Sequence, residues 1–246
     1  MTQHAVVSRE DWLEARRALL AQEKAFTEAR DALNAQRLAL PWVKLDKAYA
    51  FDTDAGRKTL ADLFDGRSQL VVYHFMFHPD WDAGCPGCSF MADHLDGTLP
   101  HLNHHDVTLV MVSRAPLAKI QAYKRRMGWK VPWVSSAGSD FNYDFNVSST
   151  PDALAAGTAT YNYALRPVGD TPEDLPGLSA FSRDADGQVF HTYSSYGRGP
   201  EDTLGALMIL DRAPLGRNER EPMDFVRRHD EYEDAAKPAC CAGAAA

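Results

Sequence analysis

The chain has 246 residues, of which 45% are hydrophobic and 24% are charged. This composition is ordinary for a soluble globular protein with one sizeable core, and it excludes wholesale disorder. Lys and Arg number 26 against 34 Asp and Glu, so the formal net charge is −8, which argues against nucleic acid and anionic membranes as partners. No stretch approaches the roughly 20 apolar residues that cross a bilayer. Residues 1–11 lack the basic and apolar regions of a signal peptide, so we expect a cytoplasmic protein.

An N-terminal arm, residues 1–40, is predicted to be one long helix. Ser8 is a suitable N-cap because acidic residues follow it. A helix from Ser8 to Arg37 would be about 45 Å long. Apolar residues recur at every seventh position, at Trp12, Leu19, Phe26, Leu33 and Leu40. The companion row is weak, so we favour packing of this stripe on the chain's own domain and keep a homodimer through the helix as the alternative.

Residues 41–218 are predicted to form an α/β domain with a mixed central sheet flanked by helices. Two nearly continuous apolar runs, Leu70–Phe77 and Val107–Val112, are typical of strands buried on both faces. The other expected elements are a strand at 43–51, a short helix at 58–64, a helix from 86, a helix at 117–127, a strand at 133–135, a hairpin at 178–193 and a helix at 204–210. This alternation, ending in a hairpin, indicates an α/β sandwich. Residues 148–177 are expected to be an insertion loop and 219–246 a charged, mobile tail.

The most informative segment is Gly84-Cys85-Pro86-Gly87-Cys88, between a predicted buried strand and a helix. Pro86 suits the first helical position, which places both thiols on one face of the first turn. Unpaired N–H groups and the helix dipole favour the thiolate of Cys85. Because a second thiol is in reach, the pair can form and re-form a disulfide. We therefore predict that Cys85 is the attacking thiolate and Cys88 the resolving thiol, with no cofactor and no metal.

Two other interpretations of the cysteines stay open: a metal site and inert thiols. A C-x-x-C motif is half of a zinc site, but a second pair with suitable spacing is missing from the predicted domain. Cys240 and Cys241 would complete a four-sulfur site only if the tail folds back, and such a site would suit a soft ion such as copper(I).

Several histidines near this motif have competing interpretations. His101, His104 and His105 could bind a metal, although histidines at a helix end are more often solvated. His74 is expected to be a hydrogen-bonded core residue, whereas His78 or Asp82 could tune the pKa of Cys85.

Longer segments give the chain a family resemblance. Residues 56–67 and 107–116 resemble the peroxiredoxin branch of the thioredoxin superfamily. More closely, the chain resembles a bacterial thioredoxin-like family known as domain of unknown function eight hundred and ninety-nine. The segments that carry this resemblance are 73–77 (YHFMF), 84–90 (GCPGCSF), 133–145 (WVSSAGSDFNYDF) and 228–232 (RHDEY). The resemblance covers nearly the whole chain, including the arm, and implies a thioredoxin-like fold.

The motif departs from those of the better-known relatives. Peroxiredoxins carry P-x-x-x-T/S-x-x-C, whereas here Pro79 lies six residues before Cys85 and Asp82 takes the place of the Thr. Leu178 stands roughly where peroxiredoxins have an Arg that polarises the peroxide. Thioredoxins place a cis-proline opposite their cysteines, and the resemblance implies that Pro176 is this proline and docks the substrate backbone.

The function that we expect is that of a thiol–disulfide oxidoreductase. Its partners would be a thiol or disulfide substrate and a cellular thiol reductant. A peroxiredoxin-like thiol peroxidase and a soft-metal-binding protein are the alternatives.

Overall fold

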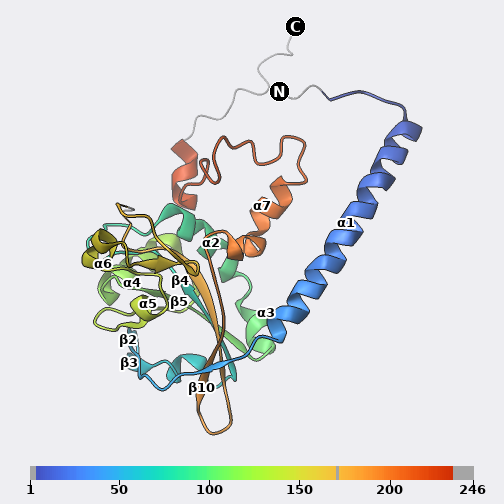
Figure 1. Cartoon of the computed structure of the whole chain (residues 1–246). Helices are drawn as coiled ribbons and strands as arrows, with labels where there is room; N and C mark the ends of the chain where they lie inside the picture. The colour runs from blue at the N-terminus through green and yellow to red at the C-terminus, as the bar shows by residue number, and fades with distance from the viewer. Residues whose placement is uncertain (1–3, 170–171, 235–246) are drawn as a thin grey trace. The chain divides into compact units, whose positions relative to one another are not determined.

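The computed structural model describes residues 4–169 and 172–234 (Figure 1). The chain forms two compact units, Met1–Trp42 and Val43–Ala246, and each is described by itself. The tail cysteines Cys240 and Cys241 lie outside the described residues. No helix in the described ranges is both long and apolar enough to cross a membrane.

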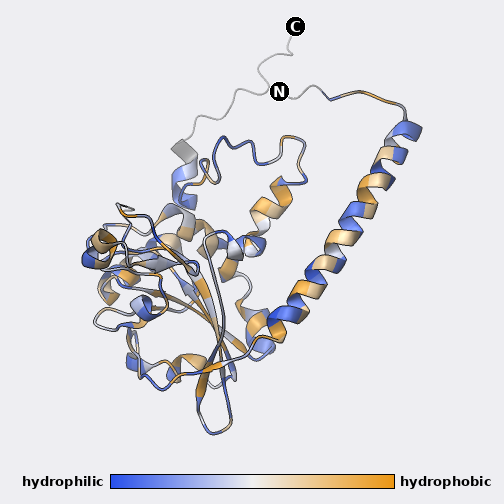
Figure 2. Ribbon diagram, viewed as in Figure 1, coloured by the Kyte–Doolittle hydropathy of each residue, from blue (hydrophilic) through white to orange (hydrophobic). Residues whose placement is uncertain are grey.

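The first unit contains the predicted long helix, α1 (Arg9–Leu38). The Ser8 hydroxyl caps it by accepting a hydrogen bond from the Asp11 backbone N–H at 3.1 Å. Hydrophobic residues alternate with hydrophilic ones along the whole helix (Figure 2). The residues of the predicted stripe are 45–70% exposed: Trp12, Leu19, Phe26 and Leu33. The helix is thus confirmed, and what its stripe packs against stays a prediction.

The second unit is built on an eight-stranded sheet in its described part. In spatial order the strands are β1 (Val43–Lys44), β10 (Val189–Tyr196), β9 (Gly177–Arg183), β4 (Gln69–His74), β5 (Val107–Ser113), β6 (Trp133–Ser135), β2 (Ala50–Thr53) and β3 (Gly56–Thr59). The central strands β4, β5 and β6 are parallel, and all other pairs in the sheet are antiparallel. The predicted mixed sheet is therefore confirmed.

Helices cover both faces of this sheet. They are α2 (Pro86–Asp96), α3 (Leu99–His104), α4 (Leu117–Met127), α5 (Phe141–Asp144), α6 (Pro151–Ala156) and α7 (Gly205–Leu210), with the short 3₁₀ helices η1 (Asp62–Phe64), η2 (Gly199–Thr203) and η3 (His229–Asp234). One hydrophobic core joins Tyr73 and Phe75 to α2, α4 and α7. The other core, on the opposite face, joins Val72 to η1 and α5. Adjacent residues of β4 enter different cores because strand side chains alternate between faces.

The structure corrects the prediction of a helix at 58–64. A turn at residues 54–55 connects β2 to β3, and Gly56, at φ +96°, lies in the region that favours glycine. The Asp62 carboxylate accepts hydrogen bonds from the backbone N–H and the hydroxyl of Thr59, so the chain turns there and only η1 is helical. The predicted strand at 43–51 is likewise divided between β1 and the start of β2.

The insertion at 148–177 has secondary structure of its own instead of forming one long loop. It contains α6 and a small hairpin of β7 (Thr160–Tyr161) and β8 (Ala164–Leu165). Thr150 caps α6 by accepting a hydrogen bond from the Ala153 backbone N–H. The buried carboxylate of Asp174 accepts hydrogen bonds from Ser148 at 2.6 Å and from Arg114 at 2.7 Å. These bonds tie the end of the insertion to the sheet.

Residues 219–234, the first part of the predicted mobile tail, contact the domain, and we call them the strap. The mobility of the tail stays a prediction. Val226 is only 5% exposed and belongs to the core around α2 and α4. Arg126 on α4 holds Asp230 at 2.7 Å and Glu231 at 3.0 Å. The charged residues of this segment led to the prediction of a solvated tail. In the structure Asp230 and Glu231 form ion pairs that fix the strap to the domain.

A chain of buried polar side chains crosses β4, β9 and β10. His74 Nε2 lies 2.8 Å from the Ser179 hydroxyl, Ser179 lies 2.8 Å from Ser194, and Ser194 lies 2.8 Å from His191 Nε2. The prediction that His74 is a hydrogen-bonded core residue is confirmed. Its Nδ1 is buried without a hydrogen-bond partner among the described residues. Burial is the main cause that lowers the pKa of His74 to about 3, and burial also lowers the pKa of His191.

These lowered pKa values predict a loss of stability in acid. Both histidines stay neutral in the folded chain, whereas in the unfolded chain they bind protons below pH ~6.5. The free energy of unfolding should therefore be unaffected by them above pH ~6.5 and fall by up to about 1.4 kcal/mol per pH unit per histidine as the pH drops toward the folded pKa. Urea unfolding of His74→Gln between pH 7 and 4 should show a shallower fall than the parent chain. His101→Gln, at an exposed position, is the control, and equal slopes in all three proteins would contradict the prediction.

Candidate active site

The two cysteines lie at the start of α2, after the loop that connects β4 to this helix. Cys85 is the N-cap residue of α2, and Pro86 occupies the first helical position, as predicted. The Cys85 N–H donates to the Met76 carbonyl at 3.1 Å, which fixes the loop between strand and helix. Cys85 is half-buried and Cys88 is 2% exposed, and both are free thiols. The structure thus brings the predicted nucleophile and resolving thiol together, with the nucleophile the more accessible.

Gly84 lies directly before Cys85, where the backbone passes close to two aromatic rings. A Cβ at this position would lie 2.6 Å from Phe75 Cε1 and 2.9 Å from Tyr123 Cε1, so only glycine fits against the two rings. Two guanidinium nitrogens of Arg228, in the strap, donate to the Gly84 carbonyl at 2.7 and 3.1 Å. The backbone at Cys85 is therefore held from the core side by aromatic rings and from the strap by a cation.

The surroundings favour the thiolate of Cys85. The largest cause is a hydrogen bond from the Cys88 thiol, and the backbone N–H groups of Cys88 and Gly87 and the charge of Arg228 act in the same direction. Burial opposes them, and the net result lowers the pKa of Cys85 to about 6. At neutral pH most of this thiol is then ionised, as a nucleophile requires.

The pKa of Cys88 is shifted in the opposite direction. Burial and the neighbouring Cys85 raise its pKa well above the ordinary value, so it stays protonated while Cys85 carries the charge. The Tyr73 hydroxyl and the Met76 backbone N–H, which donates to Cys88 Sγ at 3.4 Å, act against this rise. When Cys85 enters a disulfide, its charge disappears, and these two donors are then in place to stabilise a Cys88 thiolate.

Pro176 lies beside the cysteines but not in the predicted form. The described residues contain no cis peptide bond, so Pro176 is trans, the default for a bond before proline. The Leu175 N–H donates to the Val147 carbonyl at 2.8 Å, and the Tyr161 hydroxyl donates to the Pro176 carbonyl at 2.6 Å. Both bonds hold this segment at the start of β9. Pro176 lines one cavity together with Cys85 and Cys88, and its role in docking stays a prediction.

This cavity has a volume of about 130 Å³. Its walls come from the end of β4, from α2 and from three later segments: residue 176, residues 197–204 and residues 222–223. Tyr73, Met76, Met91, Leu204 and Met223 make most of its surface apolar. Cys85 therefore borders a small, mostly apolar space that is partly open to solvent.

Other candidate residues do not act on the thiols. His78 hydrogen-bonds to Glu173 at 3.2 Å and Asp82 is exposed, and neither is among the main causes of the lowered pKa of Cys85. Asp93 accepts hydrogen bonds from Trp129 Nε1 and His229 Nδ1, each at 2.7 Å, so it anchors the strap. The described part of the chain holds no cluster of three or more His, Cys, Asp or Glu side chains placed for a metal ion.

Sequence analysis missed two groups that shape the site. Arg228 and Tyr73 both lie in segments that carry the family resemblance, but neither was connected to the cysteines. Tyr73 could have been found from alternation along the buried strand, because it faces the side that α2 covers. Arg228 gave no such signal, since it acts from a segment that was predicted to be mobile.

A mixed sheet with two cysteines at the start of the helix that follows its central strand is the arrangement of a thioredoxin-like fold. The chain belongs to the bacterial protein family of unknown function DUF899, whose family model matches residues 1–232. The family predicted from sequence is therefore confirmed. No curated protein matches the chain.

Solved structures with a similar fold include two peroxiredoxin-type proteins. A cysteine-to-serine mutant of PrxQ from Xylella fastidiosa is 16% identical, with a TM-score of 0.41, and the match covers 65% of this chain and 88% of that one. Peroxidoxin BcpB of Mycobacterium tuberculosis is 16% identical, with a TM-score of 0.43, and the match covers 69% of this chain and 96% of that one.

Proposed function

We propose that the protein is a thiol–disulfide oxidoreductase that uses Cys85 and Cys88 as a redox pair. The observation that carries this proposal is the opposed ionisation of the two thiols, with the pKa of Cys85 lowered to about 6 and that of Cys88 raised. The more accessible thiol is thus the one whose thiolate is favoured, as the attacking member of a redox pair requires. A structural zinc site would need further ligands, and the described residues offer no cluster that includes these two thiols.

The reaction proceeds in two exchanges. The Cys85 thiolate attacks one sulfur of a substrate disulfide, forms a mixed disulfide and releases the other half as a thiolate. Cys88 then loses its proton and attacks Cys85 Sγ, which closes the Cys85–Cys88 disulfide and releases the second half. The substrate gains two electrons and the protein dithiol loses two. A cellular thiol reductant must return them, and the cytoplasm, as a reducing compartment, is the proposed location.

The first experiment is a redox titration of the two thiols. The chain with Cys240→Ser and Cys241→Ser is equilibrated across a series of glutathione ratios, alkylated and mapped by peptide mass. We expect one reversible two-electron transition that converts Cys85 and Cys88 together into a disulfide, with a midpoint at or below cytosolic potentials. A pair that never closes would overturn the proposal. Alkylation that is blocked until a chelator is added would assign the thiols to a soft metal instead.

The thiol peroxidase alternative differs only in the first step. There the Cys85 thiolate would attack a peroxide oxygen, break the O–O bond, release water or an alcohol and become a sulfenic acid. The Cys88 thiol would then capture this sulfenic acid as the same disulfide with release of water. Peroxide consumption that is faster than disulfide reduction at equal concentrations would favour this alternative.

A further inference from the structure

The cavity at the thiols is partly open, and parts of the chain that follow the sheet form two of its walls. Residues 197–204, around η2, form one wall, and Pro222 and Met223 of the strap form another. Met223 reaches over Gly87, because its Cε lies only 3.6 Å from where a Cβ on Gly87 would stand. The strap is itself held to α4 by Arg126. A substrate arm that enters this cavity therefore lies against these walls and next to Cys85.

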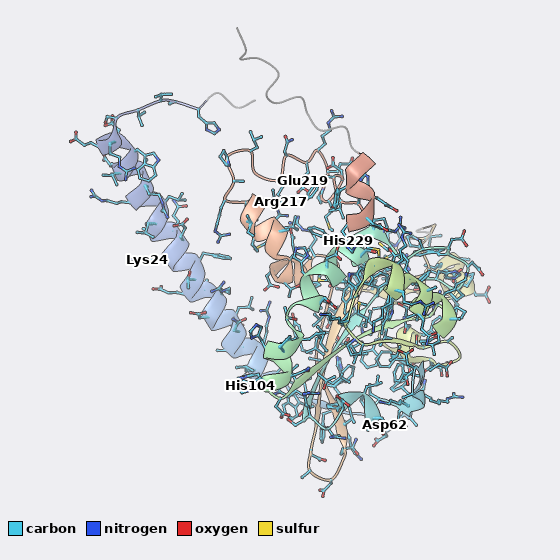
Figure 3. All side chains as sticks on the ribbon, turned by 180° about the vertical axis from the view of Figure 1, so that it is seen from behind. Lys24, Asp62, His104, Arg217, Glu219 and His229 are labelled. Atoms are coloured by element: carbon cyan, nitrogen blue, oxygen red, sulfur yellow. The ribbon has the colours of Figure 1, made fainter. Side chains whose placement is uncertain are left out.

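The charged residues at the cavity are already neutralised by each other. Arg198 pairs with Glu201 at 2.6 Å, and Arg217 pairs with the same carboxylate and with Asp211. Arg217 and Glu219, both labelled in Figure 3, lie in the segment between α7 and the rest of the strap. The two arginines, Arg198 and Arg217, are balanced by Glu201 and Asp211, so this wall offers a charged ligand little net attraction.

The size and lining of the cavity define what it can hold. An apolar cavity of about 150 Å³ is known to hold benzene. The present cavity, of about 130 Å³, is slightly smaller and is lined by methionine, leucine and proline side chains. Methionine suits such a site because its flexible thioether adapts to groups of different shape. The space therefore fits an apolar group of three to six carbon atoms, on this comparison of roughly equal volumes.

We propose that the substrates are low-molecular-weight disulfides with a short apolar arm, which occupies this cavity while Cys85 attacks. This inference rests on the proposed function and names its substrate class. One arm leaves as a free thiolate in the first exchange, and the apolar arm stays bound to Cys85 until Cys88 releases it. A folded protein disulfide presents its sulfurs beside a polypeptide backbone, which is far larger than the cavity.

The test compares pairs of disulfides with arms of equal length. Dipropyl disulfide carries apolar arms, and dithiodipropionate carries a carboxylate where the other has a methyl group. Rates of Cys85–Cys88 closure are divided by the rates with a free dithiol, which removes differences in intrinsic reactivity. The two arms share their methylenes and differ only in a methyl group against a carboxylate. Burial of the methyl group is worth about fourfold in affinity and burial of the carboxylate is unfavourable, so we expect at least about a tenfold normalised preference for the propyl arm. Insulin disulfides should react more slowly than either after the same correction.

Two variants test whether the preference for the propyl arm comes from the cavity. Met223→Gln keeps the length of the side chain but makes the wall polar, and it should lower the propyl preference at least about threefold. Met208→Gln changes a half-buried methionine of α7 that does not line the cavity, and it should keep the full preference. Alkylation of Cys85 by iodoacetamide is measured in all three proteins, and the closure rates are divided by it, which removes any change in the reactivity of the thiol itself from the comparison.

The possible failures are distinguishable. If the parent chain closes its disulfide with both compounds at equal normalised rates, or if Met223→Gln keeps the full preference, the apolar-arm proposal is wrong while the oxidoreductase proposal stands. If no disulfide of any kind oxidises the pair, the oxidoreductase proposal itself fails.

Discussion

Replacing Cys85 by serine is expected to abolish disulfide reduction, with a loss on the order of a thousandfold or more, because a serine hydroxyl is almost fully protonated at neutral pH. The site stabilises a thiolate through the Cys88 thiol, two backbone N–H groups and Arg228, and a hydroxyl gains too little from these to ionise. The measurement is closure of the disulfide and turnover with a chemical reductant. Turnover that persists in Cys85→Ser would rule out this residue as the nucleophile.

The partner variant Cys88→Ser should behave differently. It keeps the nucleophile, so the first exchange still occurs, but no buried thiol is present to release the product. A mixed disulfide should accumulate at Cys85 and appear in intact mass spectra as the protein plus one substrate arm. Both variants are made in the chain with Cys240→Ser and Cys241→Ser, because a tail thiol could otherwise replace Cys88. If Cys88→Ser turns over as fast as the parent without trapping substrate, the assignment of Cys88 as the resolving thiol is wrong.

The part of the site that could be predicted is the part whose geometry depends only on residues close together in the sequence. Cys85, Pro86 and Cys88 lie within one helical turn, and their geometry follows from the start of a helix after a buried strand. The central strands could be predicted for a similar reason, since each is a continuous apolar run. The sequence pattern of residues 58–64 predicted a helix. The structure instead has a hairpin, because the chain turns at Gly56 and Thr59 and the pattern alone does not reveal these turns.

The position of the strap at the site could not be predicted because it depends on contacts between segments that are far apart in the sequence. Arg228 and the Gly84 carbonyl are 144 residues apart in the chain. A run of charged residues favours a solvated tail when it is considered alone. Here Asp230 and Glu231 find Arg126, and Val226 enters the core, so tertiary contacts override the local preference. The same contacts place Pro222 and Met223 of the strap in the wall of the cavity at the C-x-x-C motif.

These contacts give the strap a chemical role as well as a structural one. Arg228 holds the Gly84 carbonyl, which is adjacent to the nucleophile, and its charge favours the Cys85 thiolate. Glu231 accepts a hydrogen bond from Arg228 at 2.9 Å and orients the guanidinium group. Reactivity at the start of α2 should therefore depend on a residue near the other end of the chain.

Replacing Arg228 by methionine is expected to raise the pKa of Cys85 above its value of about 6, because a cation that stabilises the thiolate is removed while the length of the side chain is kept. An increase of one unit would leave about a tenth of the thiol ionised at pH 6 instead of about half, so alkylation would be roughly fivefold slower there. Near pH 9 the rates of variant and parent should converge. The measurement is the rate of Cys85 alkylation by iodoacetamide between pH 4 and 9.

Two further variants separate this electrostatic role from support of the strap. Arg126→Met removes the arginine that pairs with Asp230, yet Arg126 is not among the main groups that set the pKa of Cys85, so its midpoint should stay near 6. Arg228→Lys keeps the charge but loses the paired hydrogen bonds to Gly84, and it should restore part of the lower midpoint. An unchanged midpoint in Arg228→Met would refute the role of its charge. An equal rise in Arg126→Met would show that the strap acts only by holding the site closed.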